Sequence, residues 1–182
     1  MNKPNFRPVQ TKRLNLRPVN DADQLLVFEG LSNPDLTRFM LVHYPTLEAA
    51  SEQMDYYREQ ESAGLGFYWV IEDHEEHIGL GVIGFHNISI VHERAEIGFW
   101  ILPNYQRKGY VQEAAEALIR VAFVEQDFLR IEASVETDNA ASRALLLGLG
   151  FRSEGVLRSY EWNRGNRIDL EWLGLLKADW LK

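Results

Sequence analysis

The chain of 182 residues has the length of one domain, and its composition, 46% hydrophobic and 25% charged, is that of an ordinary globular protein. It has no cysteine, which excludes disulfides, thiolate metal ligands and a cysteine nucleophile. The net charge of −8 disfavours nucleic-acid binding through phosphates and favours an amine or a basic peptide as partner.

No apolar run approaches the ~20 residues that a membrane span needs, and the first residues lack the apolar stretch of a secretory signal. The chain is therefore expected to be cytoplasmic and to have no membrane partner. We expect one domain over residues 1–182, with residues 1–9 flexible. The composition leaves the oligomeric state open between a monomer and a homodimer.

The first half of the chain predicts a strand, two helices and a meander. Alternating Leu14 and Leu16 indicate a short strand, after which Asn20 or Asp21 can cap a helix. Thr46 can cap a second helix that runs to about residue 62. Segments rich in β-formers follow, separated by acidic or glycine turns, and predict an antiparallel meander over residues 67–72, 78–90 and 94–102.

In the second half the period of the apolar residues changes from strand to helix and back. Apolar residues recur at helical spacing between Gly109 and Glu125. A strand over 130–136, a helix over 139–147 that ends at Gly148 and Gly150, and two strands flanking 163–166 complete the pattern. The order of elements predicts an α+β protein with a mixed sheet.

The segment Gln106-Arg107-Lys108-Gly109-Tyr110-Val111 follows a predicted strand directly and opens a predicted helix. The backbone N–H groups at a helix start converge on an anion, and glycine allows the backbone to approach it closely. Arg107 and Lys108 can add charge-assisted contacts to a pyrophosphate or a 3′-phosphate. Considered alone, the segment is equally compatible with an ordinary tight turn.

The context of this loop resembles the acetyl-CoA-binding motif of the GNAT acetyltransferases, a Gln/Arg-x-x-Gly-x-Gly/Ala loop after a strand. Gln106, Gly109 and Val111 occupy its three defining positions, and Val111 departs from the usual Gly or Ala. Over nearly the whole chain, further segments resemble the branch that acetylates ribosomal-protein alanine or serine N-termini: 11–18, Asn139-x-x-Ser142, 148–151, 154–158, Gly165 with Asp169, and Asp179-Trp180. Leu147 replaces the lysine common in that branch.

The resemblance implies the GNAT acyl-CoA N-acyltransferase fold, a three-layer arrangement in which helices flank a mixed, mostly antiparallel sheet. It implies acetyl-CoA as co-substrate, no metal, and an amine acceptor, above all the N-terminal amine of a ribosomal protein. Polyamines, antibiotics and amino acids remain alternative acceptors, as does a non-catalytic acyl-CoA-binding module. The implied cofactor-binding residues are Phe99, Trp100, Ile101, Gln106, Arg107, Lys108, Gly109, Tyr110, Val111, Asn139 and Ser142.

Two glutamates compete as the general base of acetyl transfer to an amine. Strand alternation places Glu96 on the face opposite Ala95 and Ile97, and related acetyltransferases use a similar strand glutamate through water. Glu161 stands where the ribosomal-protein branch carries a catalytic glutamate, with Ser142 as the partner that protonates the CoA sulfur. Glu96 is equally compatible with an ion-paired strand residue, and Asn139 with a helix cap. The oxyanion donor is expected to be a backbone N–H within 99–101.

Two further patterns carry less weight. The glycines between Gly79 and Gly84 match a dinucleotide-binding fingerprint, but they lie in a β-rich run and open no helix. His74-Glu75-Glu76-His77 lies between two strands beside Asp73, where a solvated turn is the better interpretation, and no metal site is predicted. No serine-hydrolase elbow or nucleoside-triphosphate loop occurs in the sequence.

Overall fold

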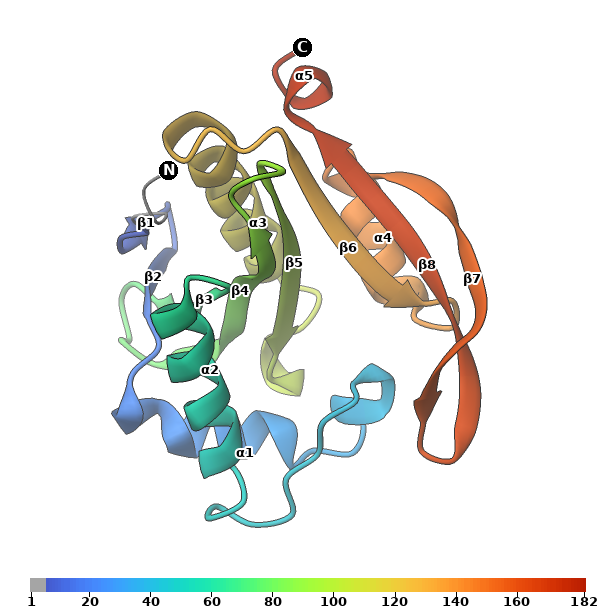
Figure 1. The fold of residues 1–182 in the computed structure, drawn as a ribbon. Coiled ribbons are helices and arrows are strands. Elements are labelled where there is room, and N and C mark those ends of the chain that lie inside the picture. Colours follow the sequence, from blue (N-terminus) through green and yellow to red (C-terminus); the bar gives the residue numbers. More distant parts are fainter. Residues whose placement is uncertain (1–5) are drawn as a thin grey trace.

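The computed structural model describes residues 6–182, which form an eight-stranded sheet with helices against both of its faces (Figure 1). The strands lie in the order β1-β2-β3-β4-β5-β6-β8-β7. Neighbouring strands are antiparallel except β5 and β6, which are parallel. The α+β class and the mixed, mostly antiparallel sheet are therefore confirmed.

The elements follow the chain in nearly the predicted order. The strands are β1 (Val9–Gln10), β2 (Leu14–Pro18), β3 (Phe67–Asp73), β4 (Gly79–Ser89), β5 (Arg94–Ile101), β6 (Arg130–Glu136), β7 (Arg152–Asn163) and β8 (Asn166–Leu176). The α-helices are α1 (Gln24–Leu31), α2 (Ser51–Ala63), α3 (Tyr110–Arg120), α4 (Ala140–Gly148) and α5 (Lys177–Trp180). Residues 6–182 also form three short 3-10 helices, η1 (Asp21–Asp23), η2 (Thr37–Phe39) and η3 (Pro103–Tyr105), and a π-helix, η4 (Val121–Glu125).

Two hydrophobic clusters fill the two faces of the sheet. The larger lies between the sheet and the helices α3 and α4, and it contains Trp69, Phe85 and Phe123. The smaller packs Val27 of α1 and Tyr57 of α2 against the opposite face. Figure 1 shows α1 and α2 in front of the first half of the sheet, so the same face of β6, β8 and β7 is not covered by them.

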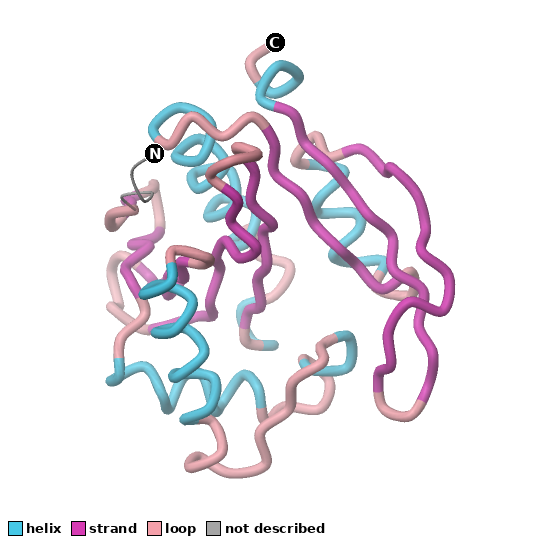
Figure 2. The backbone as a smooth tube through the Cα atoms, viewed as in Figure 1, coloured by secondary structure: helices cyan, strands magenta, loops and turns pink. Residues whose placement is uncertain are grey.

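The α1–α2 connection reaches across to the C-terminal hairpin. Figure 2 shows this connection as loop interrupted by a short helical segment, the 3-10 helix η2. Asn163 Nδ2 donates to the Arg38 carbonyl at 3.2 Å, and Arg164 Nη2 donates to Thr37 Oγ1 at 3.0 Å. These bonds hold the connection against the tip of the β7–β8 hairpin, in front of the uncovered strands.

The structure corrects one expectation about the N-terminal segment. Flexibility was expected over residues 1–9, of which 1–5 lie outside the described residues. Phe6 is buried, and its ring centroid lies 5.2 Å from that of Trp69. Val9 pairs with Leu16 in β1, a strand too short for any periodicity to reveal. The segment from Phe6 therefore belongs to the folded core.

The structure also corrects the start of the second helix. Thr46 Oγ1 accepts from the Ala49 N–H at 3.2 Å, as a helix cap would, but residues 47–50 form a turn and α2 starts only at Ser51. The predicted helix over 109–125 is confirmed by α3 and η4. Its last turn is π-helical, with the Gln126 N–H donating to the Val121 carbonyl at 3.1 Å.

Candidate active site

The parallel strands β5 and β6 are paired at one end only. Their register ends where Glu96 lies opposite Glu132. Beyond that point β5 stays paired with β4 as far as Ile101, and β6 with β8 as far as Glu136. The two strands therefore diverge toward their C-terminal ends (Figure 1).

The divergence leaves backbone groups of β5 without a strand partner. The Leu102 N–H donates to the Leu80 carbonyl at 2.8 Å, and alternation along β5 then directs the Trp100 N–H toward β4 as well. The N–H groups of Phe99 and Ile101 point the other way, toward β6, with which neither residue is paired. The Ile101 carbonyl accepts from Gln106 Nε2 at 3.4 Å. Two N–H donors thus face the space between the strands.

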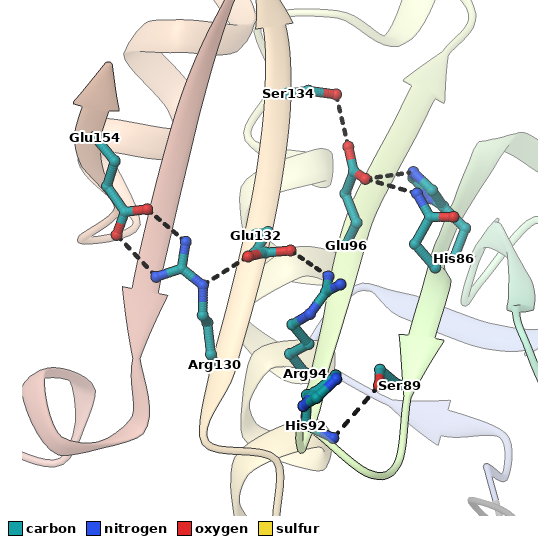
Figure 3. Close-up of polar contacts among 10 residues, drawn as sticks. His86, Ser89, His92, Arg94, Glu96, Arg130, Glu132, Ser134 and Glu154 are labelled. Atoms are coloured by element: carbon teal, nitrogen blue, oxygen red, sulfur yellow. Dashed lines mark hydrogen bonds and ion pairs between the residues drawn. The ribbon is translucent and has the colours of Figure 1, made fainter.

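At the paired end, charged side chains form an ion-pair ladder across the sheet (Arg94, Glu132, Arg130 and Glu154; Figure 3). Glu132 accepts from Arg94 Nη1 at 2.6 Å and from Arg130 Nε at 2.7 Å. Arg130 reaches Glu154 on β7 across Gly174, where a Cβ would lie 2.7 Å from Arg130 Nη1. The ladder thus joins β5, β6 and β7 where the divergence begins.

The loop 106–111 lies beside the open end of β5. Gly109 has φ +78° and precedes α3, and no side chain in the described part of the chain caps this helix. The first backbone bond runs from the Glu113 N–H to the Gly109 carbonyl at 3.1 Å. The N–H groups of Tyr110, Val111 and Gln112 therefore have no helical acceptor, which is the arrangement that binds an anion.

The side chains of this loop leave its N–H groups accessible. Arg107 is exposed and has φ +59°, and Lys108 Nζ lies 5.3 Å from the centroid of the Tyr105 ring. Val111 packs its side chain against the main hydrophobic cluster, so its departure from Gly or Ala does not fill the loop. The uncapped N–H groups and the two cations fit the phosphates of a CoA ester.

A cavity of about 380 Å³ opens between the uncovered strands and the α1–α2 connection. Three carboxylates line it, those of Glu96, Glu136 and Glu161. Its other polar side chains are His86, Asn87 and Ser134, and its apolar wall consists of Phe39, Leu41, Tyr160, Ile168, Leu170 and Trp172. The cavity therefore suits a ligand that carries a positive charge next to an apolar part.

Both oxygens of Glu96 are occupied by hydrogen bonds. Oε1 accepts from Ser134 Oγ at 2.6 Å, and Oε2 accepts from Asn87 Nδ2 at 2.9 Å and lies 3.5 Å from His86 Nε2 (Figure 3). Burial alone would raise the pKa of Glu96, but the hydrogen bonds and charge of these neighbours lower it to about 2. His86 contributes most to the lowering. Glu96 is a buried, ionised and fully bonded carboxylate.

Glu161 lies in the opposite electrostatic situation. No hydrogen bond or ion pair joins its carboxylate to any residue in the described part of the chain. Burial raises its pKa, and the negative charges of Glu96 and Glu136 raise it further. A bulge between Leu157 and Glu161 shifts the β7–β8 register. Glu161 therefore has the free lone pairs and the raised pKa that a general base requires.

Ser142 and Asn139 lie at the start of α4, which follows the open end of β6. Asn139 Oδ1 accepts from the Ser142 N–H at 3.2 Å, so Asn139 caps the helix, the interpretation left open by the sequence. Ser142 is half-buried and is not among the residues that line the cavity. The structure thus brings Glu96 and Glu161 to one cavity and places Ser142 outside it.

Sequence reasoning missed four polar residues of the cavity: His86, Asn87, Ser134 and Glu136. His86 lies directly opposite Glu96 in the β4–β5 register, and the bulge that follows brings Asn87 to the same carboxylate at φ +48°. Ser134 and Glu136 share the face of β6 that alternation predicts for even-numbered residues. The alternation was readable from the sequence, whereas the strand register was not.

The two discounted patterns lie in a strand and in a turn. The glycines from Gly79 to Gly84 lie within β4, where a Cβ on Gly81 would collide with the Trp100 carbonyl. Asp73 Oδ1 accepts from the N–H groups of Glu75 and Glu76 and closes the turn that contains both histidines. Within residues 6–182, no group of three or more His, Asp or Glu side chains is arranged to hold a metal, and no helix is long and apolar enough to cross a membrane.

Comparison with known proteins gives a family match and a full-length relative. A family model described as "Acetyltransferase (GNAT) domain" matches residues 13–152. The N-acetyltransferase YoaA of Bacillus subtilis, described as uncharacterized, is 35% identical over 173 residues, which cover 94% of this chain and 98% of the relative.

Two further proteins carry names that specify an acceptor. The ribosomal-protein-serine acetyltransferase of Escherichia coli is 32% identical over 83 residues, 46% of each chain. The crystal structure of spermidine N-acetyltransferase from Vibrio cholerae, in complex with CoA and spermine, superposes with a TM-score of 0.83 at 20% identity. It covers 94% of this chain and 100% of that one, and the likeness confirms the fold.

Proposed function

The chain belongs to the GNAT acetyltransferases and is an N-acetyltransferase, and from this premise we propose that it acetylates the N-terminal amine of a ribosomal protein beginning with Ser or Ala. The observation that carries the proposal is the unpaired Glu161 in a cavity lined by three carboxylates. The relative from Escherichia coli supports the acceptor class through its name and its partial identity.

Acetyl-CoA supplies the acetyl group as an activated thioester. The uncapped N–H groups of Tyr110, Val111 and Gln112, with Arg107 and Lys108, would hold its phosphates. The free N–H groups of Phe99 and Ile101 would hold the extended arm and stabilise the negative charge that develops on the thioester oxygen. Gln106 would keep the loop in place through its bond to the Ile101 carbonyl.

Glu161 is the general base in this proposal. Its carboxylate has no partner in the described chain, and a raised pKa brings it nearer to that of the amine whose proton it accepts. Glu96 is instead assigned to position His86 and Asn87 and to hold a negative charge beside the incoming ammonium. Ser142 would give its hydroxyl proton to the CoA sulfur from the start of α4.

The charge of the cavity fits an amine that arrives protonated. Three carboxylates attract an ammonium group, which must then lose one proton before it can attack a thioester. An α-amine has an ordinary pKa of roughly 7.7–8.0, against about 10.4 for lysine, so its neutral form is much more abundant at neutral pH. The N-terminal amine is therefore the acceptor that a general base deprotonates most easily.

A polyamine is the second candidate, because a cavity with three carboxylates also suits a flexible chain with several ammonium groups. A protein of similar fold, 20% identical, is named for spermidine. The two candidates differ in what surrounds the reacting amine, since a peptide places an amide next to it and a polyamine places a second cation several methylenes away.

Mass-spectrometric detection of acetyl transfer to a mixed acceptor panel tests the proposal. The panel holds peptides with Ser, Ala and Leu N-termini, the same peptides with blocked N-termini, and spermidine, and CoA release is followed in parallel. We expect acetylation of the free Ser and Ala peptides and none of the blocked ones. Preferred acetylation of spermidine would replace the first candidate by the second, and CoA binding without any transfer would indicate a non-catalytic module.

A further inference from the structure

The turn between β1 and β2 is tied to the start of α3 by three side chains, which we call the clamp (Thr11, Arg13 and Glu113). Glu113 Oε1 accepts from Thr11 Oγ1 at 2.6 Å and from the Arg13 backbone N–H at 2.9 Å. Its Oε2 accepts from Arg13 Nε at 2.7 Å. Burial alone would raise the pKa of Glu113, but these bonds lower it. The bond from Thr11 contributes most to the lowering, and the carboxylate stays ionised.

Arg13 also contacts the anion-binding loop itself. Its Nη1 donates to the Lys108 carbonyl at 3.0 Å, and its guanidinium lies 4.5 Å from the centroid of the Tyr110 ring. Its Nη2 lies 3.5 Å from the position that a Cβ on Gly109 would occupy. In the described part of the chain Nη2 has no hydrogen-bond partner. Nε and Nη1 of the guanidinium are thus fixed by protein groups, and Nη2 remains available beside the loop.

The loop needs such support because its backbone is strained. Arg107 has φ +59°, a left-handed conformation that is unfavourable for a residue with a side chain, and Gly109 follows at φ +78°. The bond from Arg13 holds the Lys108 carbonyl on the side of β2. Carbonyl and N–H groups of one peptide unit point in opposite directions, so fixing this carbonyl also fixes the N–H of Gly109.

We infer that Arg13 is a further CoA-binding residue: the clamp fixes the loop in its anion-binding conformation, and Arg13 Nη2 donates to a phosphate oxygen of CoA. Arginine suits both tasks at once, since its planar guanidinium presents five donors in a rigid arrangement. The inference rests on the proposed binding of acetyl-CoA at residues 106–111.

Isothermal titration with CoA tests the inference without requiring turnover. Arg13→Ala should raise the dissociation constant at least about tenfold, because hydrogen bonds to charged groups contribute that much. Arg13→Lys keeps the charge but cannot make both sets of bonds, so it should recover only part of the affinity. Glu113→Gln should also weaken CoA binding, because it keeps the arginine but removes the charge that holds the Arg13 side chain against the loop.

Lys12→Ala is the matched control. It removes the same charge one position away, where the side chain is exposed and forms no hydrogen bond or ion pair with the described residues. We expect its CoA affinity to stay within about twofold of the wild type. In acetyl transfer, Arg13→Ala should raise KM for acetyl-CoA and leave KM for the acceptor unchanged, a split that general loss of structure does not produce.

The outcomes separate this inference from the proposed function. Wild-type protein that does not bind CoA would overturn the proposed function and the inference with it. Wild-type binding together with equal affinities for Arg13→Ala and Lys12→Ala would overturn the inference alone. If Arg13→Ala proves too unstable to titrate, Arg13→Lys and Glu113→Gln decide the question, and unchanged affinity in both would overturn it.

Discussion

The two ends of the β5–β6 pair are built on opposite principles. At the paired end, Arg94, Arg130, Glu132 and Glu154 neutralise one another in the ion-pair ladder (Figure 3). At the open end, polar groups have no partner among residues 6–182: the N–H groups that face the gap and the carboxylate of Glu161. Charges are thus paired at the end where β5 and β6 are hydrogen-bonded to each other. Polar groups are left unpaired at the end where a substrate would supply the partner.

Glu161→Gln should produce the largest effect, a loss of activity at the open end without a change at the paired end. Removing a general base lowers kcat by about 10²–10⁴-fold. CoA affinity and thermal stability should stay near those of the wild type, because the carboxylate bonds to no described residue. Steady-state kinetics with CoA titration provide the measurement. Full activity in this variant, combined with loss of activity in Glu96→Gln, would transfer the role of base to Glu96.

Features made by residues close together in the chain were predictable from the sequence, whereas features made by strand pairing were not. The loop 106–111 and the helix after it were predicted because glycine, charge and helical period lie together in the chain. The cavity was only half predicted: Glu96 and Glu161 were named, but His86 and Ser134 were not. Their contribution depends on the register of β4 with β5 and on the distance between β5 and β6, which no local pattern specifies.

Glu96→Gln should affect stability more than any change at the ladder. Because the pKa of Glu96 is lowered from its ordinary 4.5 to about 2, its ionised form stabilises the fold above pH 4.5, and this contribution is lost as pH falls toward 2. The loss at neutral pH should be up to about 3 kcal/mol. Urea unfolding at neutral pH and near pH 3 checks this. The gap between wild type and variant should narrow in acid, and a constant gap would contradict the assigned cause.

Glu132→Gln breaks the paired end and should have a smaller effect. The variant loses the charge shared by Arg94 and Arg130, both of which are partly exposed, so the cost should be about 1 kcal/mol. Urea unfolding at low and high salt measures it, and the difference from wild type should shrink at high salt. Unchanged kcat per folded molecule is expected, and a loss like that of Glu161→Gln would show that the two ends are not separate.

Glu136→Gln should cause the smallest change, a shift in the pH dependence of activity. This variant tests whether Glu161 is the base by altering the charge beside it without replacing it. The negative charge of Glu136 contributes to the raised pKa of Glu161, so removing that charge should lower the pKa of Glu161. If Glu161 is the base, the acidic limb of the kcat/KM profile moves to lower pH by the same amount. Asp138→Asn is the matched control, since this exposed carboxylate lies near the end of the same strand and outside the cavity. An acidic limb that moves equally in both variants would reflect net charge alone, and one that moves in neither would mean that Glu161 does not set it.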